Sequence, residues 1–204
     1  MRGLTKMLFL PGAGASAMFW RPVADRLDPG RMRHFFAWPG LGNEPPDPSI
    51  RGLDDLVAMV LADLDEPADL IAQSMGGIVA LRVALAAPHK IRRLVLTATS
   101  GGVPVHDLGG SDWRLDYRRE FSNAASWITQ DIRIREDLSS RLTSINAPSL
   151  LICGDLDTIS PLSVGHRLHQ LLACADFHVV RGGGHDLAQT HAVEIAPLIA
   201  HHLR

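Results

Sequence analysis

A serine lies where the chain passes from a short apolar run into a helical pattern. Such a turn brings the strand and helix backbones together, so small residues are needed two positions before and after the serine. Ala72 and Gly76 provide them around Ser74. The turn would expose the Ser74 hydroxyl and direct the Met75 N–H toward the same point, where it could bind an oxyanion. These residues favour a nucleophilic serine, and the alternative is a serine that only begins a helix.

A serine hydroxyl needs a base before it can attack, and a histidine is suitably placed. His185 follows three consecutive glycines after the last predicted strand. Parallel sheets place their sites in the loops that follow the strands, so His185 is the candidate base. His166 and His169 are three residues apart, which is a weak metal-binding pattern. Because no third ligand accompanies them, we predict no metal site.

The base in turn needs a carboxylate that fixes its orientation. Asp155 and Asp157 lie together on the loop after the apolar run 150–153. Spacing alone does not choose between them. Either aspartate could instead form an Asx turn or cap the helix that follows.

A glycine-rich turn follows the first apolar run, at residues 11–16. Turns of this kind can bind phosphates, but the third glycine of GxGxxG and a following GK[ST] are both missing. Nucleotide binding is therefore not expected. An exposed Ala13 N–H could instead complete an oxyanion hole with Met75.

The chain alternates short apolar runs with longer helical patterns. The runs are short enough for buried strands, at residues 7–10, 34–37, 69–72, 94–97, 150–153 and 177–180. Helices are expected at residues 19–27, 50–64, 75–87, 162–172 and 193–203. This alternation predicts an α/β fold, with mostly parallel strands and helices on both faces of the sheet.

Residues 100–146 interrupt the alternation, because no convincing strand lies among them. We predict a small, mainly helical insertion. Trp113, Tyr117 and Phe121 are spaced by four and form one helical stripe. The stripe could pack on the core, or it could form a lid over a substrate pocket, and periodicity leaves both open.

Length and composition favour one globular domain over residues 1–204. The hydrophobic fraction is 46% and the charged fraction 21%, while the net charge of −2 gives no basic field for nucleic acid. No apolar run is long enough to span a membrane. Cys153 and Cys174 lie in apolar stretches, so we expect buried thiols in a reducing, cytoplasmic compartment.

Several segments carry a resemblance to a known family. They are Leu8–Gly14 with Phe19 and Trp20, Trp38–Gly42, Gln73–Gly77, Leu142–Asp157, and Gly184 with His185. In this order they resemble the α/β-hydrolase superfamily, especially the compact bacterial esterase-like members related to biotin- and menaquinone-pathway enzymes. Pro11 replaces the histidine that is usual in the first segment.

The resemblance implies an α/β-hydrolase fold of about six strands, with residues 100–146 as a short helical cap. Residues 1–6 leave no room for the antiparallel strand pair with which the family usually begins. By the family's alignment Asp157 is the acid, which gives a Ser74–His185–Asp157 triad with Ala13 and Met75 at the oxyanion. We also expect the substrate to contact aromatic side chains, namely Trp38, Trp113, Tyr117 and Phe121.

The resemblance implies a serine hydrolase that cleaves a small carboxylic ester, thioester or lactone through an acyl-enzyme. No cofactor is implied, and the expected partner is a small acyl substrate. A carbon–carbon hydrolase or lyase could use the same residues, with the Ser–His pair abstracting a proton. The third alternative is a non-catalytic ligand-binding member. Acyl-chain preference and oligomeric state are not predicted.

Overall fold

The computed structural model describes residues 5–131 and 136–204. In this part of the chain six parallel strands form one sheet with the order β2-β1-β3-β4-β5-β6. Their bounds are β1 Met7–Leu10, β2 Arg33–Phe35, β3 Ala68–Gln73, β4 Ile91–Thr97, β5 Ser149–Gly154 and β6 Ala175–Val180. The predicted α/β class and parallel sheet are confirmed.

The central strands are buried on both faces, as their unbroken apolar runs predict. All four residues of β1 are buried. Because side chains alternate across a strand, Leu8 and Leu10 enter one core cluster while Met7 and Phe9 enter the other. The sheet therefore needs helices on both faces.

Helices cover both faces of the sheet. The larger core cluster contains residues of α2 Leu53–Ala62, α3 Met75–Ala86 and α7 Leu162–Leu171. The second cluster contains residues of α1 Arg21–Ala24, α8 Leu187–Thr190 and α9 Ala192–His202. A 3₁₀ turn, η1 Pro88–Lys90, precedes β4.

Several expected elements differ in their bounds from the structure, and the first helix and the second strand show this. The helix predicted at residues 19–27 is regular only over α1, because turns replace its first and last residues. The strand predicted at residues 34–37 is β2, which is shorter and begins one residue earlier. Phe36 N still donates to Phe9 O at 2.9 Å, and the chain then turns away from the sheet.

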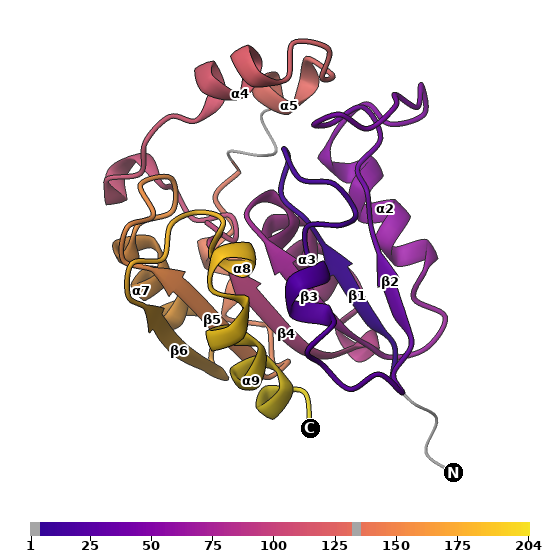
Figure 1. The fold of residues 1–204 in the computed structure, drawn as a ribbon, viewed down its shortest axis with the longest axis vertical. Helices are drawn as coiled ribbons and strands as arrows, with labels where there is room; N and C mark the ends of the chain where they lie inside the picture. The colour runs from indigo at the N-terminus through magenta and orange to yellow at the C-terminus, as the bar shows by residue number, and fades with distance from the viewer. Residues whose placement is uncertain (1–4, 132–135) are drawn as a thin grey trace.

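The region predicted as an insertion holds short helices in its described residues. These are η2 His106–Leu108, α4 Arg114–Glu120, α5 Trp127–Gln130 and α6 Ser139–Leu142. Residues 132–135 of the predicted insertion lie outside the described residues. Figure 1 shows α4 and α5 beyond the ends of the strands, at the top of the view, where they lie over the loops that follow β1 and β2. The insertion thus lies at the carboxyl-terminal ends of the strands, where a site is expected.

The two cysteines have different surroundings. Cys153 on β5 is buried, as predicted, but Cys174 is exposed, so the expectation of two buried thiols is wrong for Cys174. Cys174 lies between α7 and β6, where the chain turns at the surface. Among the helices that the structure describes, none is long and apolar enough to cross a membrane.

Candidate active site

Ser74 lies on the sharp turn between β3 and α3. Its backbone has φ 53° and ψ −122°, a conformation that L-residues rarely adopt and that costs about 1–3 kcal/mol. Ser74 N donates to Thr97 O at 3.1 Å on the neighbouring strand, which holds the turn against β4. A Cβ at Gly76 would lie 2.5 Å from the carbonyl oxygens of Leu10 and Pro11. The small residue predicted there is therefore required by the close approach of α3 to β1.

The structure brings Ser74, His185 and Asp157 together from loops far apart in the sequence. Ser74 Oγ lies 2.9 Å from His185 Nε2. His185 Nδ1 lies 2.9 Å from Asp157 Oδ2 and 3.1 Å from Asp157 Oδ1. This arrangement can move a proton from the serine hydroxyl to the imidazole while the carboxylate holds the ring.

Asp157 is fixed in its ionised form by its surroundings. Its carboxylate is buried, and Oδ1 accepts the backbone N–H groups of Ile159 and Ser160, both at 2.9 Å. Burial raises the pKa of Asp157, but the hydrogen bond and charge of His185 and the two backbone N–H groups outweigh it, so the pKa lies below its usual value. The charged form is thus available to orient His185.

Asp155, the other carboxylate of this loop, lies in a different place. Its side chain is exposed, and its Oδ1 accepts the Gly182 N–H at 2.7 Å. This contact joins the loop after β5 to the loop after β6. Asp155 therefore stabilises the loop that carries His185 and does not itself contact the imidazole.

Two residues near Ser74 were not predicted to have a role. Gln73 is buried at the end of β3, and its Nε2 donates to His185 O at 3.1 Å, which connects the nucleophile strand to the histidine loop. Thr99 Oγ1 donates to Ser74 O and accepts the Gly101 N–H. A polar glutamine directly after the apolar run 70–72 is a signal in the sequence. Nothing in the spacing indicates Thr99.

The proposed oxyanion donors are both backbone amides beside Ser74. Met75 begins α3, so its N–H is one of the unsatisfied donors at the helix N-terminus. Within residues 5–131 and 136–204, the N–H groups of Ala13 and Met75 donate to no protein acceptor. A Cβ at Gly12 would lie 3.1 Å from Ser74 Cβ, which shows how closely the loop after β1 approaches the serine. Both amides are thus available to a negatively charged oxygen.

Trp38 lacks the exposed surface that the predicted substrate contact requires. Its side chain is fully buried, and its Nε1 donates to Pro11 O at 2.8 Å. An indole with no accessible surface offers no face to a substrate. The predicted substrate contact of Trp38 does not fit this burial.

The aromatic stripe of α4 packs ring against ring and faces the loop after β1. Trp113 and Tyr117 have centroids 5.5 Å apart, and Tyr117 and Phe121 have centroids 5.0 Å apart. Tyr117 is buried, whereas Trp113 and Phe121 are half-buried. A Cβ at Gly14 would lie 2.8 Å from the Phe121 ring, so Phe121 packs on the glycine-rich loop. Trp113 and Phe121 keep surface that a substrate could contact.

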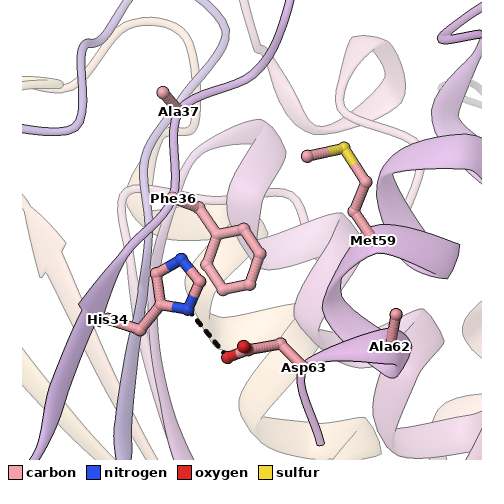
Figure 2. Close-up of a pocket in the computed structure, with 6 residues that line it drawn as sticks. All are labelled: His34, Phe36, Ala37, Met59, Ala62 and Asp63. Carbon is pink, nitrogen blue, oxygen red and sulfur yellow. Dashed lines mark hydrogen bonds and ion pairs between the residues drawn. The ribbon is translucent and has the colours of Figure 1, made fainter.

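A hollow of about 410 Å³ lies away from Ser74, between β2 and α2. Figure 2 shows that its side chains come from β2, α2 and the residues that directly follow each of them, and they are His34, Phe36, Ala37, Met59, Ala62 and Asp63. His34 Nδ1 lies 2.8 Å from Asp63 Oδ2, so the hollow contains a histidine–aspartate pair. Its lining includes no serine, threonine or cysteine, so it offers this pair no side-chain nucleophile.

No cluster of three or more His, Cys, Asp or Glu able to hold a metal ion occurs within the described ranges. Cys153 is a buried thiol on β5. Burial, with the Asp157 charge, raises the pKa of the Cys153 thiol to about 12. Since the thiolate is the reactive form, Cys153 is inert at neutral pH.

Comparison with known proteins identifies the family. The profile of the alpha/beta hydrolase family matches residues 7–198. The chain belongs to this family. Its relatives are named esterases and hydrolases, so the chain is an enzyme of the hydrolase class.

The hydrolase is similar to several bacterial enzymes. A pimeloyl-[acyl-carrier protein] methyl ester esterase of Yersinia enterocolitica is 24% identical over 95% of this chain and 91% of that protein. A similarly named esterase of Pectobacterium carotovorum is 34% identical, but this match spans 48% of this chain and 38% of that protein. A 2-hydroxy-6-oxononadienedioate/2-hydroxy-6-oxononatrienedioate hydrolase of Paraburkholderia phymatum is 29% identical over 89% of this chain and 80% of that protein.

Solved structures share the fold of the hydrolase. A meta-cleavage product hydrolase from Pseudomonas fluorescens IP01 has a TM-score of 0.76 and 20% identity, over 98% of this chain and 90% of that one. A bacterial membrane phospholipase A has a TM-score of 0.81 and 20% identity, over 100% of this chain and 79% of that one. At these identities the likeness shows the fold alone.

Proposed function

We propose that this hydrolase cleaves a small carboxylic ester, thioester or lactone through an acyl-enzyme on Ser74. The observation that carries the proposal is the continuous chain of contacts from Ser74 Oγ through His185 to Asp157. The strained turn at Ser74 and the unpaired Met75 N–H beside it support the same function.

In the proposed first half-reaction, Ser74 Oγ attacks the acyl carbon and its proton passes to His185 Nε2. The carbonyl oxygen becomes negative and accepts the N–H groups of Ala13 and Met75. When the tetrahedral intermediate collapses, the bond to the leaving oxygen breaks and His185 returns the proton to it. An ester thus loses its alcohol, a thioester loses a thiol in the same way, and a lactone keeps the new hydroxyl on the acyl group that stays on Ser74.

In the second half-reaction, His185 takes a proton from water and the hydroxyl attacks the acyl carbon. The same amides hold the oxyanion, and collapse releases the carboxylic acid and restores Ser74. Asp157 stays ionised throughout and stabilises the imidazolium. The reaction requires no cofactor, and its proposed partner is the acyl substrate alone.

The relatives' names supply a second candidate. The Paraburkholderia relative is named as a hydrolase of an oxo-dienedioate, which suggests that this chain could cleave a carbon–carbon bond. In that reaction the Ser–His pair would first act as a base toward the substrate. The matches to methyl ester esterases over 95% of the chain favour the ester.

A substrate panel tests the two candidates. The enzyme is incubated with methyl and p-nitrophenyl esters of graded acyl length, and separately with oxo-dienoate substrates. The proposed function predicts ester turnover that exceeds carbon–carbon cleavage. Turnover of the oxo-dienoates with esters left intact would instead favour the second candidate, and a protein that binds but turns over neither would be a non-catalytic member.

A further inference from the structure

The last residue of β1 and the loop after it are held by hydrogen bonds to four successive carbonyl groups. Trp20 Nε1 donates to Leu10 O at 3.1 Å, and Trp38 Nε1 donates to Pro11 O at 2.8 Å. Ala15 N donates to Gly12 O at 3.3 Å, and Tyr117 Oη donates to Ala13 O at 3.1 Å. Three of the donors are aromatic side chains from different parts of the chain. We call residues 10–15 the oxyanion loop.

Tyr117 is the donor that reaches this loop from the predicted insertion. Its hydroxyl donates to Ala13 O and accepts the Gly42 N–H at 2.9 Å, so it joins α4 to the loops after β1 and β2. The side chain is buried, and its ring lies between Trp113 and Phe121. Because both roles of the hydroxyl are filled and the ring is packed, the phenol has little freedom to move.

The geometry of the peptide group connects this contact to the proposed oxyanion donor. The Gly12 carbonyl and the Ala13 N–H belong to one planar peptide group, and the Ala13 carbonyl belongs to the next. The Ala15 N–H holds the first group and the Tyr117 hydroxyl holds the second. Fixing both planes fixes the direction of the Ala13 N–H.

We propose that Tyr117 is a positioning residue that keeps the Ala13 N–H aimed at the oxyanion. The proposal rests on the proposed acyl-transfer function. It gives the insertion a part in stabilising the transition state, in addition to any contact that Trp113 and Phe121 make with the substrate. Tyr117 acts through the loop and does not itself touch the reacting atoms.

The test is Tyr117→Phe, which removes the hydroxyl and keeps the ring. Loss of one oxyanion donor lowers kcat by about 10²–10³, and a misdirected donor should have a smaller effect, so we expect kcat to fall by about 10–100-fold. KM should change by less than about twofold, because the Ala13 N–H interacts most strongly in the transition state. Leu115→Ala, at an exposed position on the same helix, is the matched control and should keep both constants.

A boronic acid inhibitor provides a readout that a purely structural role would not change. The Ser74 oxygen donates an electron pair to boron as its proton passes to His185, and the tetrahedral adduct places a boron-bound oxygen at the amides. Its inhibition constant should rise by about the same factor as kcat falls, while that of the product acid stays unchanged. Titration of Ser74 with a fluorophosphonate counts competent sites, so partial unfolding does not distort kcat.

Two results would overturn the proposal while leaving the function intact. One is an active wild type whose Tyr117→Phe variant keeps its kcat and boronate affinity. The other is a variant in which KM and all inhibition constants rise together. Trp38→Phe, which frees the Pro11 carbonyl one peptide group earlier in the oxyanion loop, is a second variant in case Tyr117→Phe does not fold. If the carbonyl contacts of this loop aim the Ala13 N–H, Trp38→Phe should weaken boronate binding by a smaller factor, and an unchanged boronate affinity would count against the proposal. A wild type that neither turns over esters nor reacts with the fluorophosphonate would instead refute the function.

Discussion

The carboxylate of Asp157 lies 2.9 Å from His185 Nδ1 and joins the loop after β5 to the loop after β6. Its Oδ1 accepts two backbone N–H groups of its own loop, so the orientation of the carboxylate does not depend on His185 alone. The neighbouring Asp155 bonds the Gly182 N–H instead. The two aspartates of this loop therefore have different partners, a backbone amide for Asp155 and an imidazole for Asp157.

This difference predicts unequal effects of the two Asp→Asn substitutions. Asp157→Asn should lower kcat by about 10⁴, the loss known for the equivalent change in serine proteases, because the amide no longer holds the required imidazole tautomer. Asp155→Asn should mainly lower the melting temperature. Steady-state kinetics and thermal unfolding of both variants check this. Equal losses, or a larger loss for Asp155→Asn, would show that Asp157 is not the acid.

The lowered pKa of Asp157 predicts how stability depends on pH. A carboxyl group whose pKa is lower in the folded state stabilises that state above its unfolded value of about 3.8, and the contribution disappears as the pH falls through the folded pKa. The difference in unfolding free energy between wild type and Asp157→Asn should therefore shrink below about pH 3.8. Urea denaturation of both proteins between about pH 3 and 6 measures it. A difference that grows on acidification would contradict the sign.

The half-buried Trp113 is the residue on which the lid hypothesis depends. If its exposed face binds the apolar part of the substrate, Trp113→Ala should weaken the binding of long acyl chains by about 1–3 kcal/mol and raise their KM accordingly. The KM of acetyl esters should change little. KM across an acyl-length series measures this, with Leu115→Ala as the control on the same helix. Equal changes in KM for every chain length, together with a large drop in melting temperature, would mean that the stripe is only a packing surface.

The strands and the Ser74 turn could be predicted because they depend on local features. Short apolar runs indicate buried strands, and small residues on either side of Ser74 are required by the turn itself. The choice of Asp157 over Asp155 depended on the family resemblance, since both lie on one loop.

Other features depend on contacts between distant residues and could not be predicted. The Tyr117 hydroxyl donates a hydrogen bond to the carbonyl of Ala13, 104 residues earlier in the chain. Helical spacing indicated only that this face of the helix is buried. The indole N–H of Trp38 donates to the Pro11 carbonyl, a contact that no local pattern indicates. Similarly, apolar neighbours suggested a buried Cys174, but the chain turns at the surface there.

The most direct test of the account is to trap the acyl group on the enzyme. The wild type and Ser74→Ala are mixed with an activated ester, quenched with acid and analysed by intact-protein and peptide mass spectrometry. We expect an acyl adduct on Ser74 of the wild type and none on Ser74→Ala, whose kcat should fall by up to about 10⁶ while it remains folded. An adduct on another residue, or a Ser74→Ala variant that hydrolyses esters at the wild-type rate, would contradict the assignment of Ser74 as the nucleophile.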